Sequence, residues 1–327
     1  MALNLFSRKR ATRPAASGMG RGAGYVPAGE TALPDDPLKR ALQQGRLGLL
    51  LHVPDDAADP RQSEAMRRRA AQQFDERFGM VPEGLASITT SVQDQPGAPE
   101  VDHEIEAFLL ARHAVTNEDY QFFVDDGGYD QLELWPEDIW PHLVGFKDHS
   151  GAAGPRFWRK GRHDKRLARH PVVGVNYYEA AAYSEWAGLC LPTSPQWQMA
   201  ASWRVRSEAA ADRRYPWGDA LDLERCNIWA AGHARTLPVN ACPSGAAPNG
   251  VLQLIGNVWE WTRSDFDCVD DQGRRVIGEM PMKCIRGGAF DTYFPWQAVS
   301  AFQSGLTLLT RAHNVGFRCA SNIVDEC

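Results

Sequence analysis

The chain has 327 residues, 43% of them hydrophobic, and a formal net charge of −6 at pH 7. This composition is typical of a globular protein, and the acidic balance argues against a nucleic-acid binder. No stretch of about eighteen apolar residues occurs, so no membrane span is expected. Eleven tryptophans are many for this length. Because an indole ring is costly to expose, many of them are predicted to line the core or a pocket.

The seven cysteines are spread along the chain, in an odd number and without close spacing. This pattern does not predict a disulfide framework, and the absence of a Cys-x-x-Cys pair argues against a structural zinc site. In the first ten residues, basic side chains follow a short apolar stretch, the wrong order for a secretory signal. We therefore expect a reducing, cytoplasmic setting.

The N-terminal third divides into two predicted segments before a main domain over 101–327. Residues 1–30 are basic and poor in large apolar side chains, so they are expected to be a disordered tail. The tail is either a solvated segment or an arm that folds onto an acidic partner or a membrane surface. Residues 31–100 are expected to form a helical appendage and a linker, the linker over 93–99.

Two features predict helices in the appendage. Asp36-Pro37 can cap and begin a helix, with proline in its first turn. Between residues 63 and 78, apolar side chains recur every four residues and would share one helical face. These residues are Met66, Ala70, Phe74 and Phe78. We expect this face to dock on the main domain.

From residue 101 onward the pattern is mixed α and β. A strand is predicted over 107–114, and Thr116 is expected to open a helix that Gly127 ends. Residues 130–169 are irregular and aromatic. A loop of this length is usually functional or disordered, and its aromatic content argues against disorder. A second strand is predicted over 171–175.

Capping boxes predict two further helices. Asn176 with Glu179 begins the first, which Gly188 ends, and Thr193 with Gln196 begins the second. After Tyr215 the chain is expected to consist of short strands and turns.

Short motifs then follow in a fixed order. They are Leu191-Pro192-Thr193, Tyr215-Pro216-Trp217-Gly218, Gly256-Asn257-Val258-Trp259-Glu260-Trp261-Thr262, Arg286-Gly287-Gly288 and Gly316-Phe317-Arg318. Over roughly 101–322, this ordered set resembles the formylglycine-generating enzyme (sulfatase-modifying factor) family. The resemblance implies an α+β fold of the irregular type related to C-type lectins, with little regular secondary structure and buried aromatic residues.

The resemblance breaks at the positions that carry the family's best-known activity. The family holds Cu(I) with two cysteines after its glycine pair, and this chain has Thr292 and Gln297 there. A hydroxyl and an amide are poor ligands for a soft ion. Copper-dependent formylglycine formation is therefore not expected.

Iron is not expected either. Relatives that act as sulfoxide synthases bind iron through a His-x3-His-x-Glu motif on a separate helical domain, and the motif is absent from this chain. Iron chemistry would require a metal supplied by another chain.

Calcium is the metal that the resemblance leaves open. The corresponding positions are Gln253, Gly256, Val258 and Glu260, which would offer side-chain and carbonyl oxygens. In the alternative interpretation Glu260 caps backbone amides and Gln253 is a surface strand residue. A second family site would begin at Asn227, but its other ligands lie in a loop that is shortened here.

The altered positions lie in a strip where the family binds substrate. The strip residues Asp291, Thr292, Tyr293, Trp296 and Gln297 combine a carboxylate with aromatic rings, which suits capture of a ligand or peptide. Trp158 is predicted to complete the wall, together with Trp135 and Trp140 of the same long loop. The alternative is that these aromatic rings are core packing in a turn.

The leading hypothesis is a non-catalytic recognition or assembly module that binds a protein, peptide or small ligand through residues 290–297. The tail and the appendage would add contacts within a larger complex. The alternative is an oxidoreductase or maturation enzyme that uses the same pocket with another metal, or with a metal from a partner. An ordinary formylglycine-generating enzyme is the third possibility, against which the missing thiols argue most strongly.

Overall fold

The computed structural model describes residues 36–53, 59–89, 100–203, 213–266 and 280–322, together with the backbone of 268–269 and 275–276. The predicted tail over 1–30 and the linker over 93–99 lie outside these residues. Residues from Asp35 onward belong to a single unit, so the N-terminal helices pack within the same unit as the rest of the described chain.

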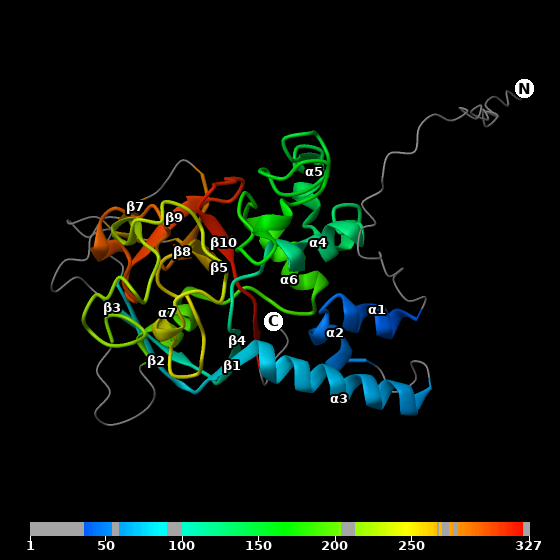
Figure 1. The fold of residues 1–327 in the computed structure, drawn as a ribbon, viewed down its shortest axis with the longest axis horizontal. Coiled ribbons are helices and arrows are strands. Elements are labelled where there is room, and N and C mark those ends of the chain that lie inside the picture. The colour runs from blue at the N-terminus through cyan, green and yellow to red at the C-terminus, as the bar shows by residue number, and fades with distance from the viewer. Residues whose placement is uncertain are drawn as a thin grey trace, which may run out of the picture. The chain divides into compact units, whose positions relative to one another are not determined.

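Three helices open the described chain: α1 (Pro37–Gln43), α2 (Leu47–Leu51) and α3 (Pro60–Arg77) (Figure 1). Aspartates at positions 36 and 59 cap α1 and α3, each with proline in the first turn. The predicted face is confirmed, because Ala70, Phe74 and Phe78 are buried and Met66 is half-buried. The segment is not helical throughout, however. Two strands that the sequence pattern does not predict follow α3.

The strands form two larger sheets and two pairs. One sheet has the order β1-β4-β11, and the other has the order β10-β5-β8-β9, in which only β10 and β5 run parallel. The pairs are β2-β3 and β6-β7. The bounds are β1 Phe78–Val81, β2 Gly84–Thr89, β3 Glu100–Ile105, β4 Phe108–Ala111, β5 Trp259–Asp265, β6 Cys268–Val269, β7 Arg275–Val276, β8 Met282–Arg286, β9 Gln303–Thr307, β10 Val315–Phe317 and β11 Ala320–Asn322. Strand β4 confirms a strand within the predicted range 107–114, although it ends at Ala111.

The capping residues predict the three central helices correctly. These helices are α4 (Asn117–Asp125), α6 (Tyr177–Trp186) and α7 (Ser194–Ser202), and each begins with a capping box. The remaining helical elements are short: η1 Leu132–Leu134, η2 Glu137–Ile139, α5 Trp140–Leu143, η3 Lys165–Leu167, η4 Trp229–Ala231, η5 Pro243–Gly245 and η6 Pro295–Gln297. Four of these seven lie in the irregular segment 130–169, as its composition suggests.

The strand predicted over 171–175 is wrong. Val172 donates its amide to Val115, whereas Gly174 donates to Ala312, so the segment bonds two separate neighbours and forms no ladder with either. Gly174 also has a φ of +75°, which interrupts an extended backbone. Residues 171–175 therefore form an irregular, largely buried segment that passes from one neighbour to the other.

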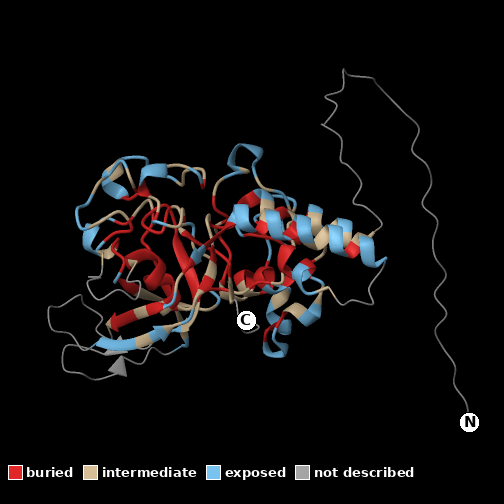
Figure 2. Cartoon of the chain, turned by 90° about the horizontal axis from the view of Figure 1, so that it is seen from below, coloured by how far each residue is buried: buried red, intermediate tan, exposed pale blue. Residues whose placement is uncertain are grey.

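Aromatic rings fill much of the core, and Figure 2 shows the buried residues beneath an exposed outer face of α3. Tyr120 stacks on Tyr183 and meets Phe123, Trp158 and Phe317 edge-on. Six of the tryptophans are buried: Trp135, Trp158, Trp186, Trp197, Trp259 and Trp261. This largely confirms the core role predicted for them.

Asp148 organises part of the long aromatic loop. Its carboxylate accepts hydrogen bonds from the amides of Ser150, Ala152 and Gly161 and from the Ser150 hydroxyl. Burial raises the pKa of Asp148, but these hydrogen bonds outweigh it and hold the pKa below its ordinary value. The carboxylate therefore stabilises the loop in its ionised form.

Asp148→Asn is expected to destabilise the protein by about 1–2 kcal/mol at pH 7, because the amide cannot accept all four bonds. A lowered folded-state pKa gives stability that is present above the unfolded pKa of about 3.9 and is lost as the pH falls through the folded value. The difference between variant and wild type should therefore shrink below about pH 4. Urea unfolding at pH 7 and pH 3 measures it. Exposed Asp130→Asn is the control, and a difference that does not depend on pH would contradict the assignment.

Two observations bear on the setting of the protein. No helix in the described ranges is both long and apolar enough to cross a bilayer. Cys190 is disulfide-bonded, whereas Cys226, Cys242, Cys284 and Cys319 are free. The disulfide at Cys190 does not fit the reducing setting that the cysteine pattern predicts, and a cytoplasmic location stays a prediction.

Candidate functional site

A buried ion pair lies beneath the motif around Trp259. The carboxylate of Glu260, on β5, is 1% exposed and Arg318 is 0% exposed. Arg318 donates to both carboxylate oxygens, from Nη2 at 2.6 Å and from Nε at 2.7 Å, and the indole of Trp197 donates at 2.7 Å. Arg318 also donates to the carbonyls of Ala111 and Leu252. The motif residues therefore join β5, α7 and the chain after β10.

The predicted calcium residues have other partners. Both oxygens of Glu260 are engaged by Arg318, and the amide oxygen of Gln253 accepts from Asn257 Nδ2 at 2.7 Å. Gln253 Nε2 donates to the carbonyls of Pro238 and Ala241. Because Arg318 neutralises Glu260, this donor set does not fit a divalent cation. Within the described ranges, no group of three or more His, Cys, Asp and Glu side chains is placed to hold a metal ion.

The glycine pair turns the chain into the strip. Gly287 and Gly288 have φ values of +98° and +76°, and a side chain at Gly287 would lie 2.6 Å from the Leu254 carbonyl oxygen. Glycine is therefore required at this turn. Thr292 closes the turn, because its hydroxyl accepts from the Ala289 amide at 2.8 Å and the residue is buried. At this position, where the family has a cysteine, the Thr292 side chain forms a hydrogen bond with the backbone.

The strip presents a continuous exposed aromatic surface, which we call the aromatic face. It consists of Trp229, Tyr293, Phe294 and Trp296, whose side chains are 41–64% exposed. Successive ring centroids are 6.2, 5.2 and 5.9 Å apart in that order. Exposure of four adjacent rings argues against the core-packing alternative for them. Gln297, in η6, is half-buried beside this surface.

Sequence reasoning did not assign Trp229 to this surface. The residue follows Asn227 by two positions and is far from the strip along the chain, but its amide donates to the Thr292 carbonyl at 3.2 Å. Tertiary packing therefore brings it beside Tyr293. Only its large apolar ring next to a shortened loop could have hinted at exposure.

Asp291 is the anionic group beside the aromatic face. Its two carboxylate oxygens accept from Asn314 Nδ2 at 3.0 and 3.1 Å, and His313 Nε2 lies 3.1 Å away. The His313 contact is an ion pair only when the imidazole is protonated. His313 also lines an open hollow on the surface. The other lining residues are Arg156, Phe157, Leu309, Thr310, Arg311 and Ala312. The carboxylate thus contacts a residue of the hollow, and it precedes Tyr293 of the aromatic face by two residues in the chain.

Trp158 does not complete this wall, contrary to the sequence prediction. It is buried, its indole donates to Asn117 Oδ1 at 2.9 Å, and its ring meets Tyr120 and His163 edge-on. These partners belong to α4 and the long loop. The tryptophan serves as a core residue because its indole N–H finds a buried acceptor.

Comparison with known proteins gives the family. The model of the sulfatase-modifying factor enzyme 1-like domain matches residues 62–323. Hercynine oxygenase of Mycobacterium tuberculosis is 38% identical over 169 residues, which are 49% of this chain and 38% of that protein. The chain thus spans less than half the length of this relative. An inactive C-alpha-formylglycine-generating enzyme 2 of Bos taurus is 32% identical over 179 residues, 50% of this chain and 56% of that protein.

The fold also matches a solved structure. The crystal structure of CarF aligns with a TM-score of 0.52 at 18% identity, covering 76% of this chain and 98% of that chain. At this identity the match concerns the fold alone, and it agrees with the α+β fold that the motifs imply.

Proposed function

Because this chain belongs to the sulfatase-modifying factor enzyme 1-like family, we propose that it uses the family's fold for recognition, binding a cationic group of a peptide or small molecule at the aromatic face. The observation that carries the proposal is the exposure of four adjacent aromatic rings, with Asp291 two residues before Tyr293 in the same strip. Ring faces attract cations, most strongly methylated ammonium groups. A neighbouring carboxylate adds charge complementarity.

At the two positions where the family binds copper through cysteines, this chain has no thiol. Thr292 is engaged by the backbone, and neither its hydroxyl nor the Gln297 amide is a soft donor. A relative whose name describes it as inactive supports a role for this fold without oxidation. The basic segment 1–30 would add contacts to an acidic partner in a larger complex.

A second candidate follows from the hercynine oxygenase relative. In that case the chain would be an oxidoreductase whose metal comes from a partner, and hercynine or a similar betaine would occupy the same face. Protein purified together with that partner would then contain near-stoichiometric iron or copper and consume oxygen. If hercynine binds equally well with and without added metal, and no oxygen is consumed, the result would instead favour recognition.

Trp296→Ala and Asp291→Asn are each expected to weaken binding of hercynine by about two- to fivefold, since a cation–π contact or an ion pair at an exposed site contributes about 0.5–1 kcal/mol. Calorimetric titration of the full chain with hercynine, and with tetramethylammonium as the minimal cation, measures this. Trp140→Ala is the matched control, because Trp140 is equally exposed but lies in α5. The proposal fails if neither cation binds at millimolar concentration, or if all three variants bind like wild type.

A further inference from the structure

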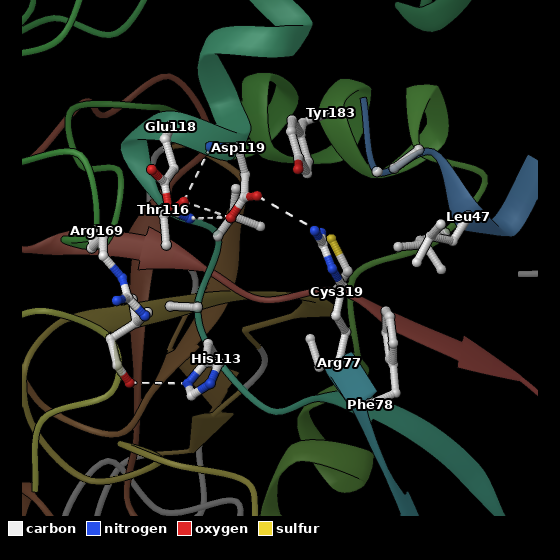
Figure 3. A pocket seen from close by; sticks show the side chains of 17 residues that line it. Leu47, Arg77, Phe78, His113, Thr116, Glu118, Asp119, Arg169, Tyr183 and Cys319 are labelled. Carbon is white, nitrogen blue, oxygen red and sulfur yellow. Dashed lines mark hydrogen bonds and ion pairs between the residues drawn. The ribbon is translucent and has the colours of Figure 1, made fainter. Parts of the chain in front are cut away.

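A separate cavity of about 220 Å³ lies between the N-terminal helices and the rest of the unit (Figure 3). Its walls come from the segment joining α1 to α2, from β1 and β4, from the start of α4 and from α6. It shares none of its lining residues with the aromatic face or with the hollow beside Asp291. Its ligand would therefore be recognised independently of the proposed function.

One wall of the cavity lies outside the part of the chain that matches the family. Gly45 and Leu47 line the cavity, and the family match begins at residue 62. Arg46, between them, fixes this wall by donating to the Trp186 carbonyl at 2.7 Å and pairing with Asp126 at 3.3 Å. The matched domain alone would leave this side of the cavity open.

An unpartnered polar group points into the cavity. Tyr183, on α6, is only 7% exposed, and its hydroxyl forms no hydrogen bond with any described residue. Figure 3 shows its oxygen directed toward the cavity. Burial raises the pKa of Tyr183 well above its ordinary value, so the phenol keeps its proton and remains a donor. A donor that faces a cavity and lacks a protein partner is satisfied there by water or by a ligand.

Across from this hydroxyl lies a loose ion pair. Arg77 Nη1 and Asp119 Oδ1 are 3.8 Å apart, and both side chains are partly accessible. Asp119 Oδ2 is occupied by Thr116, so Oδ1 is the oxygen left for a further donor. A pair this long contributes little by itself. It therefore offers a ligand one cationic group and one anionic group side by side.

The rest of the lining is mixed. Leu47, Phe78 and Leu189 are apolar, whereas His113, Glu118 and Arg169 add polar groups of both charges. The volume is below the roughly 300–1,000 Å³ of pockets that hold drug-sized molecules. The ligand must therefore be small, carry both charges close together and have an apolar group.

We propose that this cavity binds a free neutral α-amino acid with an aliphatic side chain. The carboxylate is received by the Arg77 guanidinium and the Tyr183 hydroxyl, and the ammonium group by Asp119 Oδ1. The side chain lies against Leu47 and Phe78. Each charged group of the ligand thus lies beside a group of opposite charge. A ligand with only a carboxylate would be repelled by Asp119, and a ligand with only an ammonium group would be repelled by Arg77.

L-Leucine and L-methionine are the probes, added to the full chain in thermal unfolding and calorimetric titration. At least one of them is expected to bind saturably and raise the melting temperature. Their single-charge counterparts, 4-methylpentanoate and 3-methylbutylamine, are expected to bind at least tenfold more weakly. Tyr183→Phe keeps the ring stacked on Tyr120 and removes only the oxygen. It is expected to weaken binding about tenfold, the loss of one hydrogen bond to a charged group.

Tyr178→Phe is the control, since Tyr178 lies on the same helix but does not line the cavity. Trp296→Ala should leave amino-acid binding unchanged, which separates this site from the aromatic face. The proposal is overturned if neither amino acid binds when it is added in 10-fold excess to protein at millimolar concentration. The cavity would then hold only ordered water. It is also overturned if Tyr183→Phe binds like wild type, or if a single-charge counterpart binds as tightly as its amino acid.

Discussion

Arg318→Leu is expected to destabilise the protein by about 3–5 kcal/mol, because it leaves Glu260 charged and buried without a counter-ion. The substitution also removes the donors to the carbonyls of Ala111 and Leu252. The melting temperature and the midpoint of urea unfolding should both fall far below those of the wild type.

Arg162→Leu provides the comparison. Arg162 pairs with Asp125 at 2.7 Å, but both side chains are accessible, so its loss is expected to cost no more than about 1 kcal/mol. If Arg318→Leu yields no folded protein, Arg318→Lys retains the charge and should fold with a smaller loss. A loss below about 1 kcal/mol in Arg318→Leu would mean that Glu260 is neutral or hydrated, contrary to the pairing seen here.

The ion pair also explains why the motifs in this chain do not by themselves indicate an activity. Glu260 and Arg318 stand in two of the motifs that carry the family resemblance, yet they bind each other, and Arg318 also binds backbone carbonyls. Gly287 and Gly288 are committed to a turn. These residues build the scaffold, and the chemistry depends on the side chains that the turn displays. Here those side chains are aromatic rings and a carboxylate.

The local features of the fold could be predicted because their causes are local. Thr116, Asn176 and Thr193 cap helices with partners three residues away, and glycine ends the helix after Trp186. The sequence interval 171–175 was misassigned because strand formation needs a neighbour in register, and two different neighbours share this segment. Strand pairing and burial are decided by residues distant in sequence.

The candidate site was predictable in composition but not in arrangement. The strip around Asp291 has the residues of a binding surface, and exposure of Tyr293 and Trp296 agrees with that interpretation. Trp158 could not be excluded from the sequence, because its acceptor, Asn117, lies 41 residues earlier. The ion pair between Glu260 and Arg318 could not be predicted either, because 58 residues separate the two in the chain. Tertiary partners decided both roles.

Gly48→Ala is expected to cost about 1–3 kcal/mol or more, because it would separate the first two helices from the rest of the unit. A Cβ at Gly48 would lie 2.1 Å from the carbonyl oxygen of Gly188, and both groups belong to backbones that cannot rotate away. Intrinsic helix propensity predicts the opposite sign, since alanine is favoured over glycine inside a helix by about 1 kcal/mol. The direction of the change therefore decides between packing and propensity.

Hydrogen exchange of the amides in α1 and α2, together with urea unfolding, measures this change. Leu47 and Leu50 are buried and become accessible if the helices separate, so exchange there should accelerate more than exchange in α4. Leu51→Ala is the control in the same helix, because Leu51 is exposed. A stabilised Gly48→Ala protein would refute the close contact. A separated helix pair would also remove the Leu47 wall of the cavity, so stabilisation by leucine should disappear in this variant while binding at the aromatic face persists.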